Sequence, residues 1–404
     1  MRVCLFVASD DVSKQVNIYN EIILKIIKEL GSFAIVNFNN ILKKKINLVN
    51  DQNNISILKS KFGKKIGYFN PTEKNEFLKY IGTDKIFAID GLGKSFNFFK
   101  IRKLINNKNT KLVLIMNLGF LSNEFSYPIN SLKGYLFKFN KKINNILYRF
   151  LVLIKFFPNI FIYFESRKEI YESCIKNRKK YISFFFPFLN ILYFENIYKI
   201  NSKSYDHYEK NKKSLEEKKI IFLDGNYKHL DIINRENLDI IELKKKYFKR
   251  LEFFFKWLEN IFNQKVEICL HPSSDINEYK NYFKDRIVSM YLTNENIIKS
   301  FIVIFHESSA ILDAIIYKKK IISLNTNLFG TYISNRILYY KEKLNLFSIE
   351  MDNYKNYKNY QMKDILSRLD YSIRDYDTYI ESFMKSDGEE LGVDKIIRIL
   401  KTYE

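Results

Sequence analysis

The stretch FIVIFHESSAILDAIIYKKKIISLN, residues 301–325, decides the fold class of this chain. It begins with the apolar run Phe301–Phe305 and ends with another, Ile321–Leu324, each of the length and composition of a buried strand. Between them, Ser309–Tyr317 is long enough for a short helix. A strand, a helix and a strand in direct succession are typical of a βαβ unit, in which the two strands run parallel.

The same alternation extends over most of the chain. In the second half, the strong helical pattern Lys244–Phe262 separates the strand-like run Ile220–Leu223 from Val266–Leu270 and Ile287–Met290. The strand-like runs of the first half are Arg2–Ala8, Phe33–Phe38, Lys85–Ile89, Lys111–Met116, Ile160–Phe164 and Ile182–Phe186. Together these runs predict an α/β fold with two doubly wound, Rossmann-type parallel sheets.

The domain organisation follows from length and polarity. The chain has 404 residues, which is more than one hydrophobic core usually organises. The polar stretch NSKSYDHYEKNKKSLEE, residues 201–217, is the best candidate for a linker. We therefore expect one Rossmann-like domain over residues 1–200, a second over 218–385 and a C-terminal helix over 386–404. In folds of this kind ligands bind at the carboxyl ends of the strands, so a shared cleft between the sheets is expected.

The charge and the apolar regions bear on possible partners. A formal net charge of +22 indicates attraction to phosphate, whether in nucleotides, anionic lipids or nucleic acid. The lysines are spread along the chain, and a coding bias toward Lys, Asn and Ile would raise the charge in the same way. The most apolar region, residues 146–164, is interrupted by Arg149, Lys155 and Pro158, so we expect no membrane-spanning helix there. A buried helix followed by a strand fits it, as does a basic segment on a membrane surface.

Several classes of site are disfavoured by the sequence. The three cysteines, Cys4, Cys174 and Cys269, form no CxxC pair, which argues against a disulfide framework or a structural zinc site and fits a reducing compartment. The segment Gly91–Ser95 ends like a phosphate-binding Walker A loop, but the first glycine of that motif is replaced by Ala88. No G-x-S-x-G nucleophile elbow is present.

The segment HPSSD, His271–Asp275, directly follows the expected strand Val266–Leu270. Pro272 fixes the turn and removes one backbone N–H. His271 then stands at the carboxyl end of a strand, where an imidazole can bind phosphate or act as a general acid. The serines and the aspartate of this segment are also good caps for a helix over Ile276–Phe283, and both roles can hold at once.

A pair of serines follows the expected strand Phe301–Phe305. Ser308 and Ser309 come soon after Phe301–Phe305 and open the expected helix. Backbone N–H groups and hydroxyls at a helix N-terminus form an anion site, which the helix dipole strengthens. Asp313 lies one turn after Ser309 on the same expected face, where it could accept from a ribose hydroxyl or orient the serines. Simple capping of the helix by the serines is the alternative.

These motifs carry a family resemblance. A His-Pro pair after one strand, Ser-Ser-x-x-x-Asp opening a helix and KKKIISLN as the next strand resemble the donor-binding half of bacterial GT-B glycosyltransferases. The bacterial sialyltransferases and polysialyltransferases are the most similar group, and Kdo transferases and CDP-glycerol glycerophosphotransferases are similar in this half. The resemblance covers roughly residues 218–320. It implies that His271 binds the CMP phosphate and assists leaving-group departure, and that Ser308 and Ser309 bind the phosphate.

The same families take a general base from an acidic-Gly motif. Two Asp-Gly pairs follow expected strands here, Asp90–Gly91 and Asp224–Gly225. The residues before them are Ile89 and Leu223, whereas the family often has a second acidic residue at that position. We expect Asp90 to be the base, because it would face the donor phosphate across the cleft. A simple Asp-Gly turn is the alternative. The backbone at Gly225 and Asn226 would then approach the donor phosphate.

The resemblance implies a metal-independent glycosyltransferase with Asp90 and His271 as catalytic residues. The residues expected to bind the donor are Asp224, Gly225, Asn226, His271, Pro272, Ser273, His306, Glu307, Ser308, Ser309 and Asp313. Residues 1–200 would hold the acceptor, and residues 218–385 the nucleotide-activated sugar. No metal and no cofactor besides this donor substrate is expected.

The donor would be CMP-linked, carrying a nonulosonate such as sialic acid, or Kdo. The acceptor would be a cell-surface glycan or glycolipid, and the enzyme would be cytoplasmic, at the inner face of an anionic membrane. No nucleic-acid partner is expected. Two alternatives stay open: a CDP-glycerol- or UDP-sugar-dependent transferase or epimerase of the same fold, and a non-catalytic basic protein that binds polyanions or membranes.

Overall fold

The computed structural model describes residues 2–9, 12–43, 48–82, 84–92, 99–106, 109–116, 160–179, 194–212, 217–228, 239–306 and 308–403. These residues form two compact units. The first contains the described residues up to Lys203 and those from Lys385 onward, and the second contains those between Ser204 and Met384. In the ranges that the structure describes, no helix has both the length and the apolar character needed to cross a membrane.

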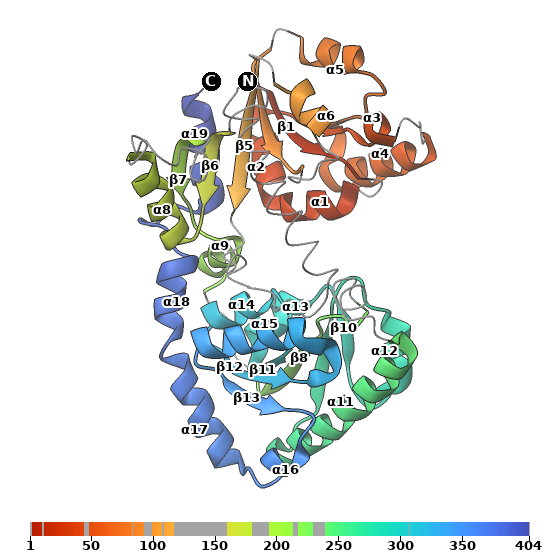
Figure 1. Cartoon of the computed structure of the whole chain (residues 1–404), viewed down its shortest axis with the longest axis vertical. Helices are drawn as coiled ribbons and strands as arrows, with labels where there is room; N and C mark the ends of the chain where they lie inside the picture. Colours follow the sequence, from red (N-terminus) through yellow and green to blue (C-terminus); the bar gives the residue numbers. More distant parts are fainter. Residues whose placement is uncertain are drawn as a thin grey trace, which may run out of the picture. The chain divides into compact units, whose positions relative to one another are not determined.

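The first unit is built on a seven-stranded sheet with the order β3-β2-β1-β4-β5-β6-β7. Its strands β1, β5, β6 and β7 are labelled in Figure 1. Every neighbouring pair of strands is parallel. The strands are β1 (Arg2–Val7), β2 (Phe33–Asn37), β3 (Ile66–Phe69), β4 (Ile86–Asp90), β5 (Thr110–Met116), β6 (Ile160–Glu165) and β7 (Phe194–Lys199). The expected parallel topology of this half is therefore confirmed.

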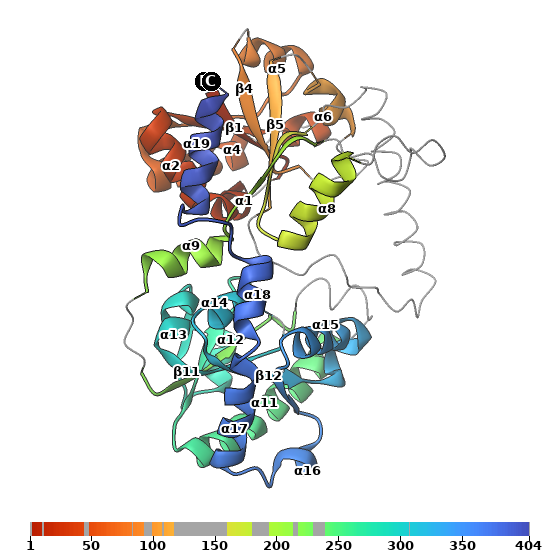
Figure 2. The same cartoon turned by 90° about the vertical axis from the view of Figure 1, so that its left-hand side faces the viewer.

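Alternate residues of these strands supply two apolar cores, one on each face of the sheet. Val3 and Leu5 of β1 belong to one core, and Cys4 and Phe6 belong to the other. The helices of this unit are α1 (Val12–Ile18), α2 (Asn20–Leu30), α3 (Asn39–Lys43), α4 (Leu48–Phe62), α5 (Lys74–Ile81), α6 (Phe99–Leu104), α8 (Lys168–Lys179) and α19 (Gly392–Thr402). Helices α2 and α19 lie side by side over the first of these cores (Figure 2).

The second unit has a six-stranded parallel sheet with the order β10-β9-β8-β11-β12-β13. Its strands are β8 (Lys219–Leu223), β9 (Val266–Leu270), β10 (Val288–Met290), β11 (Ser300–Phe305), β12 (Lys320–Asn325) and β13 (Phe347–Glu350). Its helices are α9 (Lys203–Lys210), α11 (Ile240–Phe262), α12 (Ile276–Tyr282), α13 (Thr293–Lys299), α14 (Ile311–Ile316), α15 (Gly330–Lys343), α16 (Tyr354–Tyr357), α17 (Met362–Ile373) and α18 (Tyr376–Phe383).

The long helix α11 covers one face of this second sheet, as its hydrophobic spacing predicts. Its buried residues Tyr247, Leu251, Phe255 and Leu258 pack on alternate residues of β8, β9 and β11. The short helices α13 and α14 contribute to the core on the opposite face. Asp239 caps α11 by accepting from the backbone N–H groups of the first turn, which explains where this helix begins.

Both sheets have the strand order that defines a doubly wound fold. In each, the first strand of the unit lies in the interior, and the chain proceeds first to one side of it and then to the other. The change of direction falls between β1 and β4 in the first sheet and between β8 and β11 in the second. Ligands bind in such folds beyond the carboxyl ends of the strands at this switch point.

The structure also shows strands that the sequence did not predict. β3 and β7 are the two edge strands of the first sheet, and β13 is an edge strand of the second. An edge strand has one side without a strand partner, so it does not need a long apolar run, and these three are short or carry charged residues. The expected strand at 182–186 and residues 146–159 of the apolar region lie outside the described residues.

Two other expectations need correction. The apolar spacing of Gln15–Leu30 predicts a single helix, but the segment belongs to two helices, α1 and α2, which meet at Tyr19. The polar stretch expected as a linker, residues 201–217, contains the helix α9, whose Asp206 is buried. The polarity of that segment reflects a half-exposed helix, because Tyr205 and Tyr208 pack against the core of the second unit. The C-terminal helix α19 packs within the first unit.

Candidate functional site

Three neighbouring strands of the second sheet end in polar loops. β9 and β11 flank β8, and all three run parallel, so their carboxyl ends lie at one edge. We call the residues that follow them, 224–226, 271–275, 306 and 308–309, the carboxyl loops. Neighbouring strands are about 5 Å apart, so the ends of β9 and β11 are separated by about 10 Å. His271 and the serine pair therefore stand on the same edge of the sheet, on either side of β8.

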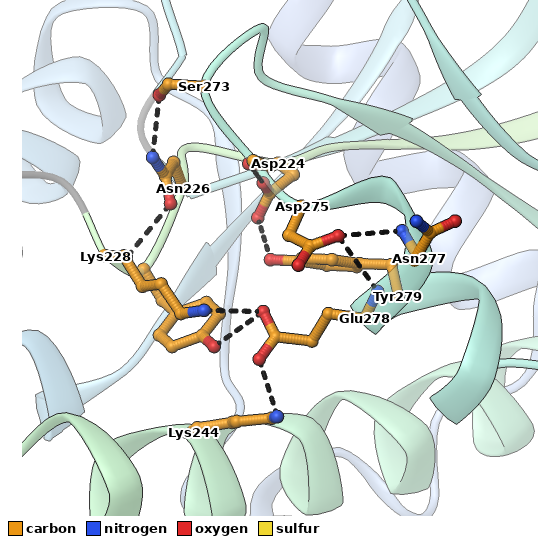
Figure 3. A network of polar contacts seen from close by, with 11 residues as sticks. Asp224, Asn226, Lys228, Lys244, Ser273, Asp275, Asn277, Glu278 and Tyr279 are labelled. Carbon is orange, nitrogen blue, oxygen red and sulfur yellow. Dashed lines mark hydrogen bonds and ion pairs between the residues drawn. The ribbon is translucent and has the colours of Figure 1, made fainter.

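Asp224 ties the loop after β8 to the loop after β9 (Figure 3). Its side chain accepts hydrogen bonds from the hydroxyls of Ser274 and Tyr279, at 2.8 Å each. The pKa of Asp224 is raised, because burial outweighs the opposing effect of these two hydroxyls and of the backbone N–H groups of Asn226 and His271. A carboxylate with this many donors is an organising group of the loops, and its lone pairs are already used.

Asn226 is a second residue that connects the loop after β8 to the loop after β9. Its backbone is left-handed, with φ at 60°, a conformation that asparagine tolerates better than most residues. Its side-chain Nδ2 donates to the Oγ of Ser273 at 2.8 Å, and its Oδ1 accepts from the backbone N–H of Lys228 at 3.1 Å. Ser273 lies in turn 2.7 Å from Nδ1 of His271, to which its backbone N–H also donates, at 3.1 Å. His271 is half-buried and is held from the Nδ1 side of its ring.

A second polar group lies beside these loops and was not found from the sequence. Glu278 of α12 accepts from the Tyr227 hydroxyl and from Nζ of Lys228, both at 2.9 Å, and pairs with Nζ of Lys244 at 2.6 Å (Figure 3). Burial by itself raises the pKa of Glu278, but the hydrogen bonds from Lys244, Lys228 and Tyr227 outweigh it and lower the pKa. These residues are distant in sequence and form no motif, so only the fold reveals the cluster.

The serine pair after β11 differs from the expectation in detail. The helix α14 begins at Ile311 rather than at Ser309, and the Oγ of Ser308 accepts from the backbone N–H of Ala310 at a long 3.4 Å. Ser308 is half-buried and Ser309 is exposed, whereas Asp313 is buried within α14. Ser309 therefore precedes the helix and does not open it, and Asp313 lies in the first turn of α14.

His306 is in the core and not on the surface of the carboxyl loops. It is 1% exposed and packs against the rings of Phe222, Tyr247 and Phe329. Its Nδ1 lies 2.5 Å from the carbonyl oxygen of Leu324. Burial lowers the pKa of His306 to about 4, so the ring is neutral at physiological pH. Its contact with Leu324 connects the end of β11 to β12. The adjacent Glu307 lies outside the described residues.

Asp90 ends β4 of the first unit and has an ionic partner. Its carboxylate pairs with Nη2 of Arg102 at 2.7 Å and accepts from the backbone N–H of Leu92 at 3.0 Å. Both charged side chains are almost fully buried. A Cβ atom on Gly91 would lie 2.7 Å from the carbonyl oxygen of Phe6, so only glycine fits there. Packing against β1 thus explains why a glycine follows Asp90.

A further buried ion pair in the first unit was not predicted. Glu165 ends β6, and Arg167 contacts it in a bidentate manner, with Nε–Oε1 and Nη2–Oε2 distances of 2.8 Å. The hydroxyl of Tyr163 also contacts this carboxylate. The sequence signal was an acidic residue directly after an apolar run, whereas Asp90 and Asp224 were singled out by the glycine that also follows them.

Comparison with known proteins identifies the fold. No protein-family model and no curated protein matches the chain. Among solved structures, a putative UDP-N-acetylglucosamine 2-epimerase from Listeria monocytogenes is 14% identical with a TM-score of 0.50, over 100% of this chain and 96% of that chain. The apo UGT2 of Phytolacca americana is 10% identical with a TM-score of 0.53, over 100% and 99%. This is the GT-B type of fold.

The GT-B expectation drawn from the sequence is thereby confirmed at the level of fold. The two parallel α/β sheets with their covering helices match those of the GT-B neighbours. At these identities the likeness shows the fold alone. The finer resemblance to sialyltransferases and Kdo transferases stays a prediction that rests on the His-Pro and Ser-Ser motifs.

Proposed function

We propose that this chain is a glycosyltransferase whose second unit binds a nucleotide-activated sugar at the carboxyl loops. One observation carries the proposal: β9, β8 and β11 are adjacent and parallel, which brings the His271 imidazole and the Ser308 and Ser309 hydroxyls to a single edge. That edge contains the switch point of a doubly wound sheet, the usual position for a nucleotide. Imidazole N–H and hydroxyl groups suit the oxygens of a phosphate.

Each carboxyl loop has a role in this proposal. His271 donates to the phosphate and, as the sugar departs, stabilises the charge that develops on the leaving group. Ser308 and Ser309 donate from the other side of β8, with the backbone of Gly225 and Asn226 between them. Pro272 and Ser273 set the turn that carries His271. With these donors the leaving phosphate needs no metal ion.

The proposal also names a class of donor and a class of acceptor. We propose a CMP-linked nonulosonate or Kdo as the donor, on the strength of the His-Pro and Ser-Ser motifs. The acceptor is then a cell-surface glycan or glycolipid, and the net charge of +22 favours approach to an anionic membrane. Asp90 is the proposed base for the acceptor hydroxyl, and its carboxylate is paired with Arg102.

A nucleotide screen tests the proposal. Purified protein is heated with CMP, CDP, UDP, GDP or ATP, and with heparin as a polyanion control. A nucleotide at a hundred times its Kd stabilises the folded state by about 2.7 kcal/mol. We expect stabilisation by CMP, loss of it in His271→Ala, and no loss in His207→Gln, which alters a histidine of α9 outside the carboxyl loops.

The other outcomes discriminate between the alternatives. Stabilisation by UDP or CDP alone would overturn the CMP assignment and keep the nucleotide-sugar site. Conversion of UDP-N-acetylglucosamine to its 2-epimer would replace transfer by epimerisation. Salt-sensitive stabilisation by heparin alone would indicate a polyanion-binding protein and overturn the proposal.

A further inference from the structure

We infer that Asn226 is a positioning residue that fixes the proton of His271 on Nε2, through the hydroxyl of Ser273. The inference deepens the proposed function and rests on it only for the ligand: His271 then meets a phosphate oxygen as a neutral hydrogen-bond donor. The hydrogen bonds that carry it run from Lys228 through Asn226 to Ser273, as Figure 3 shows, and from Ser273 to His271.

The backbone N–H of Lys228 sets the direction of the hydrogen bonds in this series. The N–H of Lys228 can only donate, so the atom of Asn226 that it meets at 3.1 Å must be the oxygen Oδ1. The nitrogen Nδ2 of Asn226 therefore faces Ser273, and it can only donate to Oγ, at 2.8 Å. With a donor on this side, the hydroxyl proton of Ser273 is free to turn toward His271.

A backbone group fixes the other end as well. The N–H of Ser273 donates to Nδ1 of His271 at 3.1 Å, so Nδ1 must present its lone pair. The Oγ of Ser273 lies 2.7 Å from the same nitrogen and donates to it. Two donors at Nδ1 leave the proton of the neutral ring on Nε2, because one ring nitrogen of a neutral imidazole accepts and the other donates.

His306 provides the opposite case within the same unit. Its Nδ1 lies 2.5 Å from the carbonyl oxygen of Leu324, which can only accept. The proton of His306 is therefore on Nδ1, and its Nε2 is unprotonated. Two histidines that follow two strands of one sheet thus hold opposite tautomers, and each tautomer is dictated by a backbone group.

This arrangement limits what His271 can do. A histidine with its proton on Nε2 and its lone pair already used at Nδ1 does not act as a general base through Nδ1. It offers an N–H to an anionic oxygen, which is the role that a departing nucleotide phosphate requires. Asn226 acts through Ser273 and does not itself have to touch the ligand to influence it.

Nitrogen NMR of the free protein tests the inference without a nucleotide. The chain has four histidines, so 15N-histidine labelling gives few signals, and His271→Gln and His306→Gln assign the two of interest. Protonated and unprotonated ring nitrogens differ widely in 15N shift. At a pH where the rings are neutral, we expect His271 protonated on Nε2 and His306 on Nδ1.

Asn226→Asp replaces the amide nitrogen that donates to Ser273 by a carboxylate oxygen, which reverses the direction of that hydrogen bond. The carboxylate still accepts from Lys228 and tolerates the left-handed backbone, but it now accepts from Ser273, which turns the hydroxyl proton away from His271. We expect the ratio of Nε2–H to Nδ1–H tautomer to fall about fivefold, the ratio that one ordinary hydrogen bond is worth. Asn263→Asp is the matched control, because Asn263 is also left-handed and ends α11.

The His306 signals report whether the variants are folded, since they depend on the core and not on Asn226. A wild-type His271 protonated on Nδ1 would overturn the inference. So would an Asn226→Asp protein with native His306 signals and the same His271 tautomer ratio as Asn263→Asp. Either result leaves nucleotide binding untouched, and failure of the nucleotide screen leaves the tautomer result untouched.

Discussion

The carboxyl ends of the two sheets carry similar acidic residues in different electrostatic settings. In the first unit, Asp90 and Glu165 are each neutralised by a buried arginine, Arg102 and Arg167. In the second unit, Asp224 is held by hydroxyls and backbone N–H groups. An acidic residue at the carboxyl end of a strand therefore does not, by its position alone, indicate a catalytic role. Two of these three carboxylates are bound by arginine, and the third organises the loops of the candidate site.

The largest expected effect concerns the ion pair of Asp90. Asp90→Asn leaves the Arg102 guanidinium buried without its counter-ion, which we expect to destabilise the first unit by about 4 kcal/mol. Hydrogen–deuterium exchange of peptides from β4 measures this locally, independently of the second unit.

The double variant Asp90→Leu/Arg102→Met is the control, because replacing both partners by apolar groups should recover most of the loss. If Asp90→Asn keeps native exchange and abolishes transfer, Asp90 acts as the base and its pairing with Arg102 does not stabilise the first unit.

The second prediction concerns the buried histidine of the second unit. The pKa of His306 is lowered from 6.5 to about 4, so its contribution to stability is complete above pH 6.5 and is lost as the pH falls toward 4. We expect this to remove about 3 kcal/mol from the free energy of unfolding of the second unit between pH 7 and pH 4.

Trp257, the single tryptophan of the chain, lies in α11 and reports unfolding of this unit by its fluorescence. His306→Asn keeps a donor for Leu324 but does not titrate, so the stability gap between wild type and variant should narrow as the pH falls. A difference in stability that stays constant from pH 7 to pH 4 would mean that the pKa of His306 in the folded unit is close to its ordinary value of 6.5.

The smallest predicted effect concerns the neutral donors of Asp224. Tyr279→Phe removes a hydroxyl that donates to a buried carboxylate, and we expect a loss of about 2 kcal/mol, measured by Trp257 fluorescence in urea.

Tyr376→Phe is a matched control in the same unit. The Tyr376 hydroxyl is buried without a hydrogen-bond partner among the described residues, so its removal should cost less than about 0.5 kcal/mol or stabilise slightly. Equal effects of the two substitutions would show that Asp224 does not depend on its hydroxyl donors.

Much of the fold could be read from the sequence. Strands buried on both sides are continuous apolar runs, so the central strands β1, β4, β5, β8 and β11 were found to within a residue or two. The edge strands β3, β7 and β13 were not found, because each has one open side and is short or carries charged residues, whereas the edge strand β10 was found from the run Ile287–Met290.

What the sequence determined by itself about the candidate site is which residues follow which strand. Because parallel strands share one carboxyl edge, the order of motifs along the chain placed His271 and Ser308 on the same edge of one sheet. What only the tertiary structure decided is the state of each side chain: His306 buried and neutral, Asp90 paired with Arg102, Asp313 buried and Asn226 directed at Ser273. These states depend on partners that are distant in sequence, and burial and hydrogen-bond direction are properties of the folded contact, not of the residue.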